Sequence, residues 1–129
     1  MELTYTQIKE LCKRSGFKPT ELDFEDWLIV DNQTADEMCR EYIEDSVWAF
    51  SSWFLASETG FDEDIFKAIQ SNDKCEDNNE AILALIRATC GIESFVESAI
   101  SCDGRGHFLS SYDGKEIKLP GDCVAYRTN

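Results

Sequence analysis

Carboxylates at helical spacing are the side chains in this sequence most able to act together. Glu37, Glu41 and Glu44 are four and three residues apart, so a helix would line them up on one exposed face, roughly 5–6 Å from one another. Such a row repels phosphate and attracts lysine and arginine. The pattern predicts a surface that binds a basic partner, completed by the acids of two further clusters: Asp62, Glu63, Asp64, Asp73, Glu76 and Asp77.

Other residue types capable of chemistry do not form a recognisable pattern. His107 is the only histidine, and its spacing from Cys102 and Cys123 matches no closed four-ligand zinc site. A cysteine–histidine pair or two carboxylates would give a small hydrolase, but no motif selects a particular pair. We expect no enzymatic activity, no metal and no cofactor, with His107 facing solvent at the start of a strand.

Phosphate and calcium motifs are also missing from the sequence. The segment DGRG at 103–106 follows a predicted helix and lacks the Lys-Ser/Thr of a P-loop. Residues 62–73 contain acids and amides, but not in the alternating order of an EF-hand loop.

Negative charge is concentrated in the middle of the chain. The 129 residues carry a net charge of −14, divided as +2 over residues 1–20, −15 over 21–80 and −1 over 81–129. This balance argues against direct binding to nucleic acid or to an anionic membrane. Solubility alone could be met by dispersed charges or interleaved lysines, so the concentration is compatible with an electrostatic binding face. A merely solvated acidic surface is the alternative.

The N-terminal sequence contains no apolar run preceded by basic residues, so we expect no signal peptide and a cytoplasmic protein. The longest mostly apolar stretch, VWAFSSWFLA, is too short to span a bilayer. The six cysteines are then expected to be thiols, mostly as small core residues.

Apolar periodicity predicts a mostly helical chain as far as residue 102. Thr34 with Glu37 resembles a capping box at the start of a long helix from 35 to 57, whose apolar stripe faces the core. A second apolar strip through Trp48 and Leu55, if exposed, would serve a homodimer or a partner contact. Residues 20–30 are compatible with a short helix opened by Thr20 or with a strand at 27–30; the other helices are expected at 5–14, 62–71, 80–90 and 92–101.

The character of the sequence changes at residue 103. Four glycines and a proline separate β-branched and aromatic residues, and Asp113-Gly114 is a strong hairpin signal. Strands are expected at 107–112, 116–118 and 123–127. The predicted fold is α+β: a single domain over 1–129, helical over 1–102 and β-rich over 103–129, with a small C-terminal antiparallel hairpin or three-stranded sheet.

Two stretches of the sequence resemble known proteins. The segment DGRGHFLSSYDGKEI, with the later VAYRTN, resembles the ends of small phage and prophage proteins. The acidic middle is similar in character to phage anti-restriction and anti-CRISPR proteins that imitate DNA. This resemblance implies an inhibitor that occupies the basic groove of a host protein that handles nucleic acid. It assigns a role to no individual residue.

Two alternatives to this inhibitor follow from the same residues. An immunity or antitoxin protein would also bind a basic target, usually a nuclease, but beside the active site rather than in the nucleic-acid groove. A small hydrolase would instead show a deep pocket lined by His107 and a cysteine.

Overall fold

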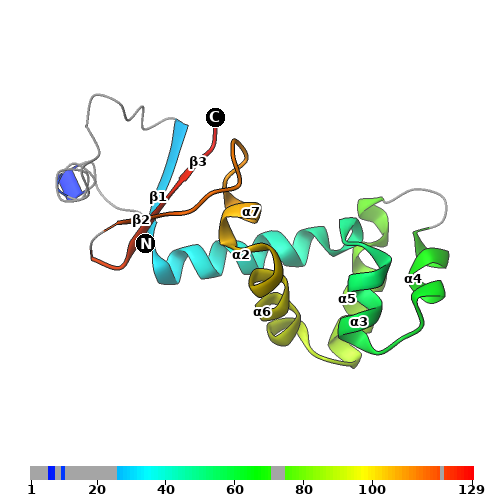
Figure 1. Cartoon of the computed structure of the whole chain (residues 1–129). Helices are drawn as coiled ribbons and strands as arrows, with labels where there is room; N and C mark the ends of the chain where they lie inside the picture. The colour runs from blue at the N-terminus through cyan, green and yellow to red at the C-terminus, as the bar shows by residue number, and fades with distance from the viewer. Residues whose placement is uncertain (1–5, 8–9, 11–25, 71–74, 120) are drawn as a thin grey trace. The chain divides into compact units, whose positions relative to one another are not determined.

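The protein is α+β and mostly helical, with a small three-stranded antiparallel sheet near the C-terminus (Figure 1). This computed structural model describes residues 6–7, 10, 26–70, 75–119 and 121–129. The fold class agrees with the sequence prediction. The predicted opening of a helix at Thr20 and most of the helix at 5–14 lie outside the described residues.

The chain divides into two compact units, which we treat separately. Residues 1–39 and 103–129 form the sheet unit, and residues 40–102 form the helical unit. The expectation that residues 1–129 behave as one domain stays a prediction.

Three strands in the order β1-β3-β2 make up the sheet. β1 (Trp27–Asp31) pairs with β3 (Cys123–Arg127) so that Ile29 faces Ala125, and β2 (Ile117–Leu119) pairs with β3 so that Lys118 faces Val124. The strand alternative for residues 27–30 is therefore confirmed. The turn between β2 and β3 uses positive φ at Gly121 (74°) and Asp122 (57°), a conformation that glycine and aspartate tolerate better than other residues.

Both faces of the sheet are apolar. One face places Val30, Val124 and Tyr126 against Ala35 of helix α2 (Asn32–Ser46). The opposite face clusters four other buried side chains: Ile29, Leu119, Cys123 and Ala125. Neighbouring side chains of a strand point to opposite faces of the sheet. Because both faces are buried, the consecutive residues CVAY of β3 are all buried, and this explains their nearly continuous apolar character.

The strand predicted at 107–112 is wrong. Residues 105–109 form the short helix α7 (Arg105–Leu109), and Asp113-Gly114 does not join two strands. Asp113 instead closes a local turn, accepting hydrogen bonds from the Lys115 amide at 3.0 Å and the Ser110 hydroxyl at 2.9 Å. Gly106 of this helix lies directly against the backbone of residues 114–116, a tertiary contact that the sequence alone does not show.

The start of the long helix also differs from the prediction. α2 begins at Asn32 rather than at residue 35, because Asp31 and not Thr34 caps it. An Asp31 carboxylate oxygen accepts the Thr34 backbone N–H at 2.7 Å, and this hydrogen bond lowers the pKa of Asp31. The predicted Thr34–Glu37 capping box is therefore wrong.

The predicted helix from 35 to 57 is interrupted. After Ser46 the chain forms a 3₁₀ turn, η2 (Val47–Ala49), and an extended Phe50. A new helix, α3 (Ser52–Thr59), then begins, with the Ser51 side chain accepting the Phe54 N–H. α3 ends at Gly60, whose φ is 80°.

The other helices, α4 (Glu63–Ile69), α5 (Asn79–Ala88) and α6 (Ile92–Asp103), follow the predicted pattern. The short 3₁₀ turn η3 (Glu76–Asn78), which precedes α5, is not among the predicted helices. α3 packs against both α4 and α5. The rings of Phe50, Phe54 and Phe95 contact one another in tilted or edge-on arrangements, with centroids 5.3–5.7 Å apart. An aromatic cluster therefore contributes to the core.

Gly106→Ala is expected to destabilise the protein by about 1–3 kcal/mol. A Cβ atom there would contact the backbone oxygen of Gly114 and lie 2.8 Å from the Lys115 carbonyl carbon, neither of which is a flexible side chain. Urea denaturation measures the loss. His107→Ala, at the exposed next residue of α7, is the control and should leave stability nearly unchanged. Equal stability of the two variants would show that the close approach at Gly106 is unimportant.

Candidate functional site

The structure distributes the predicted binding acids over several elements. Glu37 lies on the part of α2 that belongs to the sheet unit, and Glu41 and Glu44 lie on the part within the helical unit. Asp62 caps α4, and Glu63 and Asp64 form its first turn. Glu76 and Asp77 begin η3. Asp73 lies outside the described residues. Of the eight described acids, all but Glu44 and Glu63 are exposed.

The end of α2 carries acids where helix physics disfavours them. Glu44 and Asp45 lie in its last turn, which contains no basic residue, beside the negative end of the helix dipole. Glu41 and Asp45 are four residues apart and both exposed, so they repel each other. Arg40 offsets part of this charge, approaching Glu44 at 3.5 Å and Glu93 at 3.1 Å. Apart from the Arg40–Glu44 pair, these carboxylates therefore do not stabilise the helix that carries them.

Neutral donors, rather than cations, satisfy the carbonyls at the end of α2. Asn79 donates its side-chain amide to the Glu44 carbonyl at 2.7 Å and accepts the Trp48 backbone N–H at 3.2 Å. The Trp48 indole donates to the Asp45 carbonyl at 3.2 Å. Terminal carbonyls need such partners because they have none within the helix.

Asn79 also sets the position of further acids. It fixes the start of α5 at the end of α2, and the acids beside it in sequence are Glu76, Asp77 and Glu80, all exposed. We call the set at this junction the α2–α5 acidic cluster: Glu41, Glu44, Asp45, Glu76, Asp77 and Glu80. It contains four of the nine predicted binding acids.

Two more amides hold the surrounding segments in place. Gln70 donates to the carbonyls of Trp48 and Phe50, at 3.1 and 2.9 Å, which the interruption after α2 leaves free. Asn78 donates to the Ile69 carbonyl at 3.1 Å, which fixes η3 at the end of α4. A single sequence does not show which carbonyls these side chains reach.

The acids at the start of α4 have a local structural role. Asp62 caps the helix by accepting the Asp64 N–H at 2.9 Å, and acids in a first turn suit the positive end of the helix dipole. Glu63 pairs with Lys67 at 3.6 Å and accepts the Ser52 hydroxyl at 3.0 Å. This hydrogen bond holds the acidic first turn of α4 beside the start of α3.

The apolar strip that sequence analysis considered for a dimer or partner contact is not exposed. Leu55 is fully buried and Trp48 is partly buried. The exposed tryptophan is Trp53, with 67% of its surface accessible. The break after α2 changes the helical phase, and this is why the prediction selected the wrong residues.

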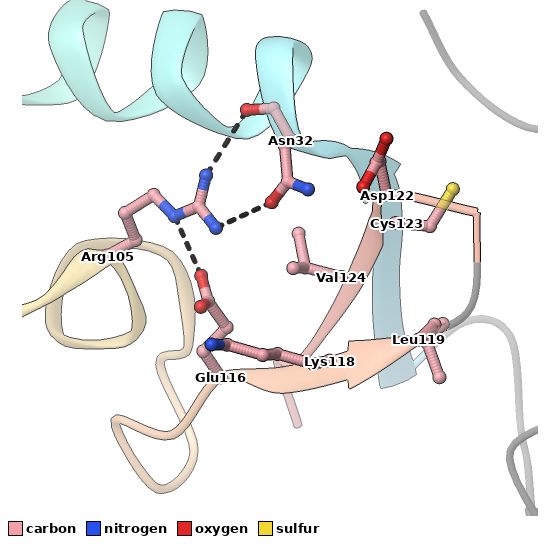
Figure 2. A pocket seen from close by; sticks show the side chains of 8 residues that line it. All are labelled: Asn32, Arg105, Glu116, Lys118, Leu119, Asp122, Cys123 and Val124. Carbon is pink, nitrogen blue, oxygen red and sulfur yellow. Dashed lines mark hydrogen bonds and ion pairs between the residues drawn. The ribbon is translucent and has the colours of Figure 1, made fainter.

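A second candidate site is a cavity of about 380 Å³ in the sheet unit, lined by residues of α2, α7 and the β2–β3 hairpin. Figure 2 shows Arg105 between Asn32 and Glu116 at its edge. Arg105 donates to Glu116 at 2.8 Å, to Asp36 at 3.0 Å, and to the Asn32 carbonyl and side chain at 3.2 and 2.8 Å. With these partners, the guanidinium connects α7 to α2 and to the residue that precedes β2, so its hydrogen-bonding groups are mostly used in structural contacts.

The titratable groups around Arg105 are held in their ordinary ionic forms. Burial alone would raise the pKa of Glu116, but hydrogen bonds from Arg105 and Tyr126 outweigh it and the pKa lies below its usual value. Burial raises the pKa of the Cys39 thiol to about 12 and that of Cys123 above its usual value. Both thiols therefore stay protonated at neutral pH, which disfavours nucleophilic chemistry.

The cysteine–histidine hypotheses gain no support from this cavity. Cys123 lines it but His107 does not; His107 is exposed on α7, so it faces solvent as predicted but on a helix rather than a strand. The five cysteines within the described ranges are free, and only Cys39 and Cys123 are buried. Among the described residues, no group of three or more metal-binding side chains comes together.

Comparisons with known proteins gave no relative: no family model, curated protein or solved structure matches the chain. Within the described ranges, no helix has both the length and the apolar character needed to cross a membrane.

Neutralising the end of α2 is expected to stabilise the protein. Glu41→Gln with Asp45→Asn removes one i,i+4 repulsion and one unfavourable dipole contact, and should raise the free energy of unfolding by about 0.5–1.5 kcal/mol at low salt. The gain should shrink in 0.5 M salt, because exposed charges are screened. Asp64→Asn, at a favourable helix N-terminus, is the opposite control and should lower stability. A destabilised double variant would contradict this account.

The Arg105–Glu116 contact should give a specific pH dependence. A folded-state pKa below the usual 4.5 of Glu116 means that its contribution is complete above that value and is lost as the pH falls through the folded pKa. Glu116→Gln should therefore cost about 1–3 kcal/mol at pH 7, and the difference from wild type should vanish under acid conditions. Urea denaturation from pH 7 to pH 3 tests this. A difference independent of pH would refute it.

Proposed function

We propose that this protein is an acidic inhibitor or regulator that binds a basic, nucleic-acid-binding surface of another protein in the cytoplasm of a host cell. The observation that carries the proposal is the α2–α5 acidic cluster. Its α2 acids sit at the wrong end of a helix, repel one another, and are only partly neutralised by Arg40. Selection for folding alone would not favour this arrangement.

Charge counts support the same conclusion. The helical unit contains 13 acids and 4 lysines or arginines, a net charge of −9 over residues 40–102. Two of the described cations, Arg40 and Lys67, are already paired with glutamates. Most of the described carboxylates of this unit are therefore free to attract a basic surface at long range, which speeds encounter, while a few close ion pairs set the register. Imitation of DNA, in the manner of phage anti-restriction and anti-CRISPR proteins, is the form of this proposal that the acidic clusters favour.

The proposal predicts salt-dependent binding that depends on the acidic cluster. The immobilised protein is used to capture host proteins at about 50 mM salt, and the salt-eluted protein is identified by mass and purified. Its affinity should then fall steeply between low and high salt, by analogy with counterion release from nucleic acid. Glu41→Gln with Asp45→Asn should weaken binding more than the charge-matched pair Glu97→Gln with Asp103→Asn.

Competition with nucleic acid decides the mode of binding. A duplex that displaces the protein from its partner supports groove occupation. A complex that forms equally well with and without duplex favours the immunity or antitoxin alternative. An affinity that is flat with salt, or equal weakening by the two charge-matched variants, would contradict the electrostatic mechanism.

A further inference from the structure

We propose that Trp53 is the anchor of the binding surface and that an arginine of the basic partner stacks on its indole ring. This inference rests on the proposed function and adds the residue that distinguishes a fitted interface from general charge attraction. The partner chemistry is an arginine-rich protein surface.

Trp53 points away from the core. It lies in the first turn of α3, and Leu55, two residues or about 200° further round the helix, is fully buried. Trp53 keeps 67% of its surface exposed, whereas Trp48 is partly buried and donates its indole N–H within the helical unit. Among the described residues, no ring or cation stacks on Trp53. Its indole face is therefore available to an outside group.

The surroundings of Trp53 are acidic. Ser52, its neighbour in sequence, donates its hydroxyl to Glu63 at 3.0 Å. This hydrogen bond, with the packing of α3 on α4, holds the first turn of α4 beside the turn that carries Trp53. That turn brings Asp62, Glu63 and Asp64, and of these three only Glu63 has a paired cation in the described structure.

An exposed indole on a helical turn that lies beside an acidic turn suits arginine better than any other side chain. The guanidinium group is planar, stacks on aromatic faces, and forms hydrogen bonds with a carboxylate at the same time. Tryptophan is the strongest aromatic partner in such contacts and is enriched among the residues that dominate binding energy. One arginine could thus contact Trp53 with its plane and a neighbouring acid with its edge.

Charge complementarity selects this occupant over a second copy of the chain. Two copies meeting through this surface would bring together helical units of net charge −9 each, within chains of net charge −14. Like charges facing each other oppose association. Phosphate-bearing partners are repelled for the same reason.

The test uses nona-arginine and nona-lysine peptides as probes, measured by calorimetry at 50 mM salt. The wild-type protein should bind nona-arginine more tightly than nona-lysine. Trp53→Ala should weaken nona-arginine binding roughly 3- to 30-fold and nona-lysine binding less. Trp53→Phe should retain part of the affinity. The matched control is Ile65→Ala, at an exposed apolar residue of α4, and should change binding less than 2-fold. Thermal denaturation confirms that each variant is folded.

The outcomes separate this inference from the proposed function. Salt-dependent binding that Trp53→Ala leaves unchanged overturns the role of Trp53 alone. Binding that depends on Trp53 but is insensitive to salt and to Glu41→Gln with Asp45→Asn overturns the electrostatic function alone. No nona-arginine binding by the wild type overturns both. A wild-type dimer that Trp53→Ala converts to a monomer, measured by sedimentation equilibrium, assigns the surface to a second copy and also overturns the inference.

Discussion

A shortage of cations is the constraint on which the helical unit depends. With 13 acids and 4 lysines or arginines over residues 40–102, ion pairs cannot neutralise the charge, and self-repulsion opposes compaction. The unit is held instead by an aromatic cluster around Phe95 and by side-chain amides. Asn79, Gln70 and Asn78 reach backbone carbonyls of distant segments at 2.7–3.1 Å. Neutral donors satisfy these carbonyls without using up surface charge, so the carboxylates remain available.

The sheet unit, by contrast, is stabilised by a network of charged side chains. A single guanidinium, that of Arg105, bonds to Asn32, Asp36 and Glu116, and the Tyr126 hydroxyl also donates to Glu116. The Arg105 side chain is 15% exposed and that of Glu116 is 22% exposed, so these contacts are stronger than pairs at the surface. The charges of this cluster stabilise the sheet unit, whereas most of the described acids between residues 40 and 102 have no such partner.

The location of an acid relative to its helix decides whether the acid also stabilises that helix. Asp62, Glu63 and Asp64 cap or begin α4, where the dipole favours them. Glu41 and Asp45 approach the end of α2, where it does not. If the protein binds a basic surface, long-range attraction comes from the whole excess of charge. Specificity then requires a residue that the partner contacts in a defined geometry, and the exposed indole of Trp53, on the turn of α3 that lies beside α4, provides one.

Local sequence signals determined the fold class, the helices at 62–71, 80–90 and 92–101, and the uneven charge, because caps, glycine breaks and apolar periodicity act within a few residues. Tertiary structure alone decided the interruption after Ser46, the helix at 105–109 and the pairing of β1 with β3. Those outcomes involve contacts between distant segments: Gln70 with the Phe50 carbonyl, Gly106 with residues 114–116, and β1 with β3, where Trp27 pairs with Arg127. Tertiary structure also decided the exposure of Trp53, because the interruption after Ser46 determines which side of α3 faces the core.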